Sequence, residues 1–168
     1  MKNIVQTRQE QNLIYVLSSD KTERKGCDDK VLVIASLFYY DLLSDSLEYL
    51  SHIPFDIDII IATSNESIVE GCQEFKASRV GVAIIYKNNR GRDIYSLLVA
   101  CKDETASYDV IGFVHDKKTS HAANNIKWEI ELWNRNIWEN MLASESYRYE
   151  VLDILQNNDD IGFLCPPE

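Results

Sequence analysis

The sequence has no hydrophobic run long enough to cross a membrane. Its longest apolar stretches, such as residues 57–62, are far shorter than the roughly 20 residues that a transmembrane helix needs. The N-terminus has neither the apolar core nor the small-residue cleavage site of a secretory signal. We therefore expect a protein with no membrane span that works in the cytoplasm.

Basic residues and cysteines are also scarce. The chain has 17 Lys and Arg against 27 Asp and Glu, a net charge of -10, which argues against non-specific binding to nucleic acid or to an anionic membrane. The four cysteines (Cys27, Cys72, Cys101 and Cys165) contain no Cys-x-x-Cys pair. We expect them to be small buried hydrophobes or free thiols, not a disulfide or metal framework.

Four short apolar runs alternate with amphipathic segments. Runs 31–35 and 57–62 are continuous and rich in β-branched residues, as in strands covered on both faces, and runs 80–86 and 110–114 predict two more strands. Helical spacing predicts three helices, whose stripes are Leu42, Leu43, Leu47 and Leu50; Ile68, Val69, Cys72 and Phe75; and Ile94, Leu97, Leu98 and Cys101. This alternation predicts an α/β fold with a mostly parallel, Rossmann-like sheet and flanking helices.

The ends of these elements and of the chain yield further expectations. We predict Thr63 and Asp93 as helix N-caps, with Glu66 completing a capping box on Thr63. A single helix is expected over 137–156 and a last short strand over 161–164. Residues 1–29 form a polar segment with a short strand at 13–17, and residues 30–168 fit one α/β domain.

Aromatic and histidine side chains outside these elements have ordinary explanations. Trp128, Trp133 and Trp138 recur every five residues, a spacing that does not put all three on one helix face. Burial is favoured over sugar stacking for them, because aromatic rings contribute mainly through buried area. His52 and His121 are expected to face solvent.

Polar loops follow the third and fourth predicted strands. Ligands bind beyond the carboxyl ends of parallel strands, so loops 88–93 and 115–120 should share one rim. Four cations lie in these loops: Arg90, Arg92, Lys117 and Lys118. They are either solvated surface charges or contacts for an anion. His115 is either a hydrogen-bonded strand-end histidine or a direct ligand contact.

Three sequence blocks occur in a fixed order. They are Leu-Phe-Tyr-Tyr-Asp-Leu at 37–42, Asn-Arg-Gly-Arg-Asp at 89–93, and the segment from Tyr108-Asp109 to His-Asp-Lys-Lys-Thr-Ser at 115–120, and a weaker block follows at 161–167. Together these blocks resemble the rhamnan synthesis protein F family from about residue 30 to the C-terminus. Ser36 departs from the family pattern, which has a histidine there. The pattern also continues beyond the last block, so we expect part of the acceptor site to lie outside this chain.

This resemblance implies the nucleotide-binding half of a GT-A glycosyltransferase. The implied activity is rhamnosyltransferase-like: a sugar passes from a nucleotide-activated donor, with dTDP-rhamnose suggested by the family, to a saccharide acceptor, free or lipid-linked. The implied setting is the synthesis of bacterial rhamnan, O-antigen or another cell-surface polysaccharide. His115 and Asp116 stand in the place of the Asp-x-Asp motif as the catalytic pair. The implied donor- and phosphate-binding residues are Asn89, Arg90, Gly91, Arg92, Asp93, Lys117, Lys118 and Thr119.

The segment His115-Asp116-Lys117 also leads to an expectation about dependence on a metal ion. Mg²⁺ or Mn²⁺ prefers carboxylate oxygens, and Asp116 is the only carboxylate left in the motif. Lys117 beside it supplies positive charge of its own, so we predict weak metal dependence. Other enzyme classes lack support, because neither a Gly-x-Ser-x-Gly elbow nor a Gly-x-Gly-x-x-Gly loop is present. The alternative hypothesis is a non-catalytic module of the same fold that binds a saccharide or a partner protein.

Overall fold

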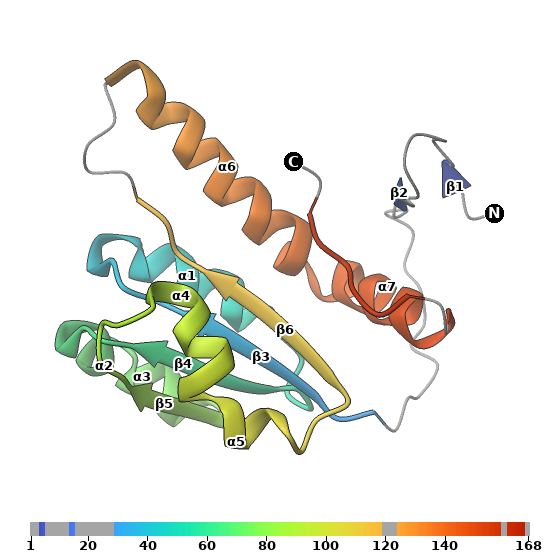
Figure 1. Ribbon diagram of the computed structural model, residues 1–168, viewed down its shortest axis with the longest axis horizontal. Helices are drawn as coiled ribbons and strands as arrows, with labels where there is room; N and C mark the ends of the chain where they lie inside the picture. Colours follow the sequence, from blue (N-terminus) through green and yellow to red (C-terminus); the bar gives the residue numbers. More distant parts are fainter. Residues whose placement is uncertain (1–3, 6–13, 16–28, 119–123, 159–160, 167–168) are drawn as a thin grey trace.

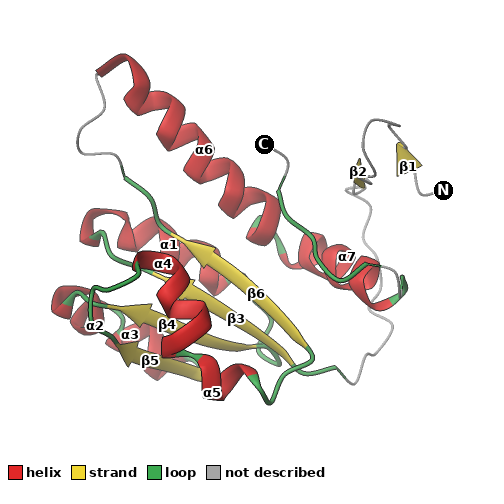
Figure 2. Cartoon of the chain, in the orientation of Figure 1, coloured by secondary structure: helices red, strands yellow, loops and turns green. Residues whose placement is uncertain are grey.

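A four-stranded parallel sheet is the centre of the computed structural model, which describes residues 4–5, 14–15, 29–118, 124–158 and 161–166. The sheet consists of β3 (Val31–Ser36), β4 (Asp58–Thr63), β5 (Val82–Tyr86) and β6 (Val110–His115), in the order β5-β4-β3-β6. Figure 2 shows all four arrows pointing the same way. This confirms the predicted α/β class and the four strands within two residues at their ends.

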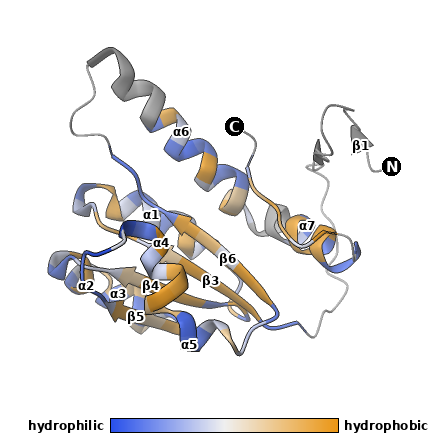
Figure 3. Ribbon diagram, in the orientation of Figure 1, coloured by the Kyte–Doolittle hydropathy of each residue, from blue (hydrophilic) through white to orange (hydrophobic). Residues whose placement is uncertain are grey.

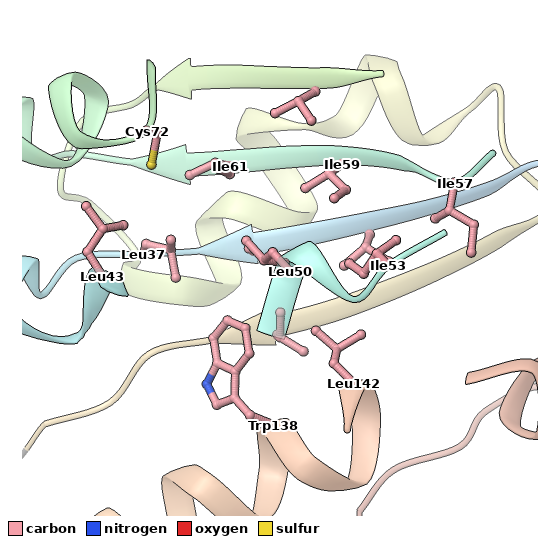
Figure 4. Close-up of a cluster of buried hydrophobic side chains, with 14 of the residues drawn as sticks. Leu37, Leu43, Leu50, Ile53, Ile57, Ile59, Ile61, Cys72, Trp138 and Leu142 are labelled. Carbon is pink, nitrogen blue, oxygen red and sulfur yellow. The ribbon is translucent and has the colours of Figure 1, made fainter. Parts of the chain in front are cut away.

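The two central strands are buried on both faces, which explains their continuous apolar runs. All six residues of β3 are buried, and Ala35 pairs in register with Ile61 of β4. One face of the sheet carries the larger core, built from residues such as Ile59 and Ile61 (Figure 4), and the other carries Leu32, Ile34 and Ile60. The strands accordingly stand out as apolar in Figure 3.

Helices cover both faces of the sheet (Figure 1). The larger core packs against α1 (Leu43–Ser51), α2 (Glu66–Gly71) and α3 (Gln73–Ser78), and the 3₁₀ turn η1 (Tyr40–Leu42) leads into α1. The other face is covered by α4 (Arg92–Tyr95), the π-helical turn η2 (Ser96–Ala100) and α5 (Lys102–Thr105). Cys72 and Cys101 are fully buried on opposite faces, and burial raises the pKa of each thiol to about 11. Both therefore behave as the predicted small hydrophobes, whereas Cys165 is exposed and Cys27 lies outside the described residues.

Two helices follow the sheet where one was predicted. They are α6 (Asn124–Leu142) and α7 (Glu145–Gln156), so the prediction of a single helix over 137–156 is wrong. The break falls at Ala143 and Ser144, and serine is a favoured residue type directly before a helix. Trp138 anchors α6 to the core: it is buried, with its ring 5.7 Å from that of Tyr49 in α1.

The terminal segments agree with the predictions only in part. β1 (Ile4–Val5) and β2 (Ile14–Tyr15) pair antiparallel, which confirms a short strand within 13–17, whose other residues lie outside the described ranges. No strand forms over 161–164, where the chain is irregular and Phe163 is 79% exposed. Those four residues look strand-like by composition but pair with no strand among the described residues.

Both predicted N-caps are wrong, and so are two predicted core residues of the third helix, Leu98 and Ile94, of which Ile94 is 52% exposed. β4 continues through Thr63, so Asn65 caps α2 instead, its side chain accepting from the Ser67 N–H at 3.0 Å. Gly91 precedes α4, and Asp93 lies inside its first turn. Leu98 is 62% exposed because the π-helical turn changes the angular spacing of the helix, turning Leu97 toward the sheet and Leu98 away.

Candidate ligand-binding rim at the carboxyl end of the sheet

The turn between β5 and α4 has an unusual backbone. The side chain of Asn88 accepts a hydrogen bond from the N–H of Arg90 at 3.1 Å, and Gly91 and Arg92 then both adopt left-handed conformations, with φ of 68° and 51°. A Cβ atom on Gly91 would lie 2.9 Å from Cβ of Tyr95, so glycine is required there. The turn leaves the side chains of Asn89, Arg90 and Arg92 exposed.

The buried side chain of Lys87 supports this turn. The sequence motifs did not predict a role for this residue. Its backbone N–H donates to the carbonyl of Thr63 at 2.8 Å, and its buried ammonium donates to the carbonyl of Arg92 at 3.1 Å. The ammonium also lies 5.7 Å from the centre of the Tyr95 ring. Burial lowers the pKa of Lys87, while the nearby carboxylate of Asp93 opposes this shift. The one feature of the sequence that could have indicated this role is the position of the lysine directly after an apolar strand.

Asp93 and His115 join the two predicted motifs. Oδ2 of Asp93 lies 3.5 Å from Nε2 of His115, and Nδ1 of the same ring lies 3.1 Å from the carbonyl oxygen of Asp116. The loop after β5 and the end of β6 therefore meet at one rim, as predicted. A protonated His115 ring could donate to both acceptors at once.

Asp116 points into the protein and fixes the loop that follows β3. It is only 8% exposed, and its Oδ2 accepts the backbone N–H groups of Phe38 and Tyr39, each at 2.8 Å. Burial raises the pKa of Asp116 to about 6, against the lowering effect of these two hydrogen bonds and of His115. Asn65 holds the same loop from the other side, donating to the carbonyl of Phe38 at 3.0 Å.

The two lysines that follow contact different elements. Lys117 is exposed, with its ammonium 4.5 Å from the centre of the Trp133 ring in α6. Lys118 forms an ion pair with Asp41, and this hydrogen bond lowers the pKa of that carboxyl group. The hydroxyl of Tyr39 donates to the carbonyl of Lys118 at 3.2 Å. Thr119 lies outside the described residues.

Ser36, the departure from the family pattern, has a structural partner. It is the last residue of β3 and is buried, with its hydroxyl 2.7 Å from that of Ser96 in the π-helical turn. This contact ties the central strand to the helix that carries Arg92 at its start. Ser36 therefore helps to position the front helix, which is formed by α4 and η2 (residues 92–100).

The remaining sequence expectations concern two histidines, Trp128, a metal site and a membrane span. His52 is exposed as expected, while His121 and the side chain of Trp128 lie outside the described residues. Within the part of the chain that the structure describes, no three His, Cys, Asp or Glu side chains lie close enough to hold a metal ion. No helix among the described residues is long and apolar enough to span a membrane.

These features define a class: an α/β protein with a parallel sheet and a cation-bearing rim at the carboxyl ends of its strands, where such folds bind ligands. The model of the family described as rhamnan synthesis protein F matches residues 1–168, and the chain belongs to this family. Comparison with curated proteins and with solved structures found no significant match.

Proposed function

We propose that this chain carries the donor-binding site of a glycosyltransferase that uses a nucleotide-activated sugar. One observation carries the proposal: Arg92 occupies a left-handed backbone conformation, which costs a residue with a side chain about 1 kcal/mol. Such strain is found mainly where function requires it. Here the side chains of Arg90 and Arg92 are exposed, and the backbone carbonyl of Arg92 is held by the buried ammonium of Lys87.

The chemistry of the reaction matches this rim. In glycosyl transfer the bond between the anomeric carbon and the diphosphate oxygen breaks, and the acceptor hydroxyl forms the new bond while its proton passes to a base or to the departing diphosphate. The leaving diphosphate gains negative charge, so cations held in place beforehand stabilise it. Arg90, Arg92 and Lys117 supply exposed cations for this task, with Asn89, Gly91 and Thr119 as backbone and side-chain contacts.

His115 and Asp116 have different parts in this proposal. His115 lies between the two loops and contacts the diphosphate or the sugar, with Asp93 orienting its ring. Asp116 acts as a positioning residue, because its carboxylate is committed to the backbone of Phe38 and Tyr39. Lys118 contributes charge while paired with Asp41.

The side chains at the rim suit a site in which lysine and arginine bind the diphosphate better than one in which a metal ion does. The carboxylate of Asp116 is buried and accepts two N–H groups, and that of Asp93 faces His115. We therefore assign no reaction step to Mg²⁺ or Mn²⁺ and expect only weak dependence on either. The donor suggested by the family is dTDP-rhamnose, and the acceptor is a saccharide, free or lipid-linked.

One observation also favours the second candidate, a non-catalytic module that binds a saccharide or a partner protein. The carboxylate in the Asp-x-Asp position points inward, away from any ligand at the rim. Binding of a nucleotide sugar distinguishes the two candidates, because only the transferase requires it.

Exchange of Arg92 for glycine tests the proposal sharply. Arg92→Gly relieves the left-handed strain but adds backbone freedom to the unfolded chain, and these effects offset each other to within about 1 kcal/mol. The loss of a charge-assisted phosphate contact, worth about 1.5 to 3 kcal/mol, should weaken donor binding roughly 10- to 100-fold. Calorimetric titration with dTDP-rhamnose and related nucleotide sugars measures this, alongside a denaturation curve.

Lys76→Ala is the matched control. Lys76 is an exposed cation near the end of α3, which leads to the opposite end of the sheet, so its loss should leave donor affinity unchanged. Equal affinity of Arg92→Gly and wild type would remove Arg92 from the site. A wild-type chain that binds no nucleotide sugar would favour the non-catalytic module.

A further inference from the structure

A second concave site lies at the opposite end of the sheet. It has a volume of about 600 Å³, within the range of roughly 300 to 1,000 Å³ that is typical of small-molecule sites. Its walls are the loop between α1 and β4 and the corner between α6 and α7. The α1–β4 loop enters β4 at its amino end, whereas the candidate donor rim lies at the carboxyl ends. Strands of about six residues, at roughly 3.3 Å per residue, separate the two sites by about 20 Å.

Arg79 makes the wall of this site rigid. Its side chain is only 7% exposed, and its guanidinium donates to the carbonyl oxygens of Ile53, Pro54 and Ile57, the last at 2.7 Å. Three carbonyl groups of one loop are thus bound to one buried cation. A loop fixed before a ligand arrives loses little conformational entropy when it binds.

The same guanidinium holds an exposed aromatic ring. Its central carbon lies 5.1 Å from the centre of the Phe55 ring, which is 76% exposed. A large apolar side chain in this position gains little from burial within the chain. Its ring instead lines the pocket, with its orientation set by the cation.

The other lining groups are mostly polar. His52, Asp56, Ser144 and Tyr149 add an imidazole, a carboxylate and two hydroxyl groups to the lining of the pocket. An aromatic face beside hydrogen-bonding groups suits a ligand with an apolar face and a rim of hydroxyls, as a pyranose has. A deoxyhexose, with a methyl group in place of one hydroxyl, has a larger apolar surface to place on such a ring.

We propose that this pocket binds a segment of the rhamnan glycan, with a pyranose ring stacked on Phe55. The inference rests on the family's link to rhamnan synthesis and on the pocket, and it does not require the transfer reaction at the rim. A glycan bound here lies on the opposite end of the sheet from the donor. The site therefore holds a part of the polymer away from the position where a sugar would be added.

The test compares two exposed phenylalanines. A rhamnose oligosaccharide of several units is titrated into the full chain and into Phe55→Ala, Phe55→Tyr and Phe163→Ala, with binding followed by calorimetry or NMR. Phe163 is as exposed as Phe55 but does not line the pocket, so it is the matched control. We expect millimolar or tighter binding by wild type, at least a tenfold loss in Phe55→Ala, and unchanged affinity in Phe55→Tyr and Phe163→Ala.

Further measurements separate this site from the rim. If Phe55→Ala does not fold, His52→Ala removes an exposed lining group outside the Arg79 contacts and should also weaken oligosaccharide binding. Addition of dTDP should not displace the oligosaccharide, and Phe55→Ala should keep donor affinity. The inference is wrong if wild type does not bind the oligosaccharide, if Phe55→Ala binds it as well as wild type does, or if dTDP competes with it.

Discussion

At the scale of single residues, Asp116 shows how a sequence motif and its structural role can diverge. Its position after β6 suggested a carboxylate that faces a ligand. The structure instead turns it inward, where one oxygen accepts two backbone N–H groups and burial raises the pKa to about 6. The balance between burial, which favours the neutral acid, and the two hydrogen bonds, which favour the carboxylate, makes this residue sensitive to pH.

This balance yields a prediction for Asp116→Asn. A carboxyl group whose pKa is raised from 3.8 to about 6 by folding contributes stability that is fully present below the unfolded pKa and is lost as pH rises through the folded pKa. Wild type should therefore lose up to about 3 kcal/mol relative to Asp116→Asn between about pH 4 and pH 6, because a tenfold change in proton affinity corresponds to about 1.4 kcal/mol. Urea denaturation at several pH values measures the difference. Parallel stability profiles for the two proteins would contradict it.

At the scale of elements, the front helix shows how a change of helical period alters which side chains face the sheet. Ile94, Leu97, Leu98 and Cys101 have the spacing of one α-helical face, but the π-helical turn widens the helix between them. Leu97 and Cys101 face the sheet, and Leu98 faces solvent beside Val99. Ser96, at the start of the turn, is fully buried against Ser36.

Neighbouring leucines therefore provide a matched pair of variants. Leu98→Ala should change the free energy of unfolding by less than about 0.5 kcal/mol, because the side chain is already mostly in water. Leu97→Ala should cost at least about 1 kcal/mol more, because its side chain packs against the second core. Chemical denaturation measures both changes. A larger effect at Leu98 would show that the helix is a continuous α-helix in solution.

At the scale of the whole molecule, the predictable part of the fold is the part that burial alone specifies. β3 and β4 are covered on both faces, so their apolar runs were sufficient to predict them. Residues 161–164 have a similar composition, yet they pair with no strand in the part of the chain that the structure describes, because pairing depends on contacts that a local pattern does not contain. The break between α6 and α7 was missed because apolar residues continue on both sides of Ser144.

The candidate rim was predictable to the same extent. The common direction of the parallel strands brought loops 88–93 and 115–118 to one end of the sheet, although β5 and β6 are its two edge strands. The contact between Asp93 and His115 shows that the two loops meet. The direction of each side chain was not predictable, since it depends on side-chain and backbone contacts between distant segments. Lys87 and Asp116 illustrate this, because contacts with distant segments bury both side chains.

The distribution of charge over the molecule leads to a prediction about metal dependence. The chain has a net charge of -10, yet Arg90, Arg92, Lys117 and Lys118 all lie in the two loops at the carboxyl ends of β5 and β6, and the buried ammonium of Lys87 donates to the carbonyl of Arg92. Donor binding there should not need a divalent ion, because these cations stabilise the diphosphate directly. We expect EDTA to weaken nucleotide-sugar binding by less than about tenfold, or roughly 1.4 kcal/mol, in both wild type and Asp116→Asn. A larger loss that added Mn²⁺ restores only in wild type would contradict this, and would establish the Asp116 carboxylate as a metal ligand despite its hydrogen bonds to Phe38 and Tyr39.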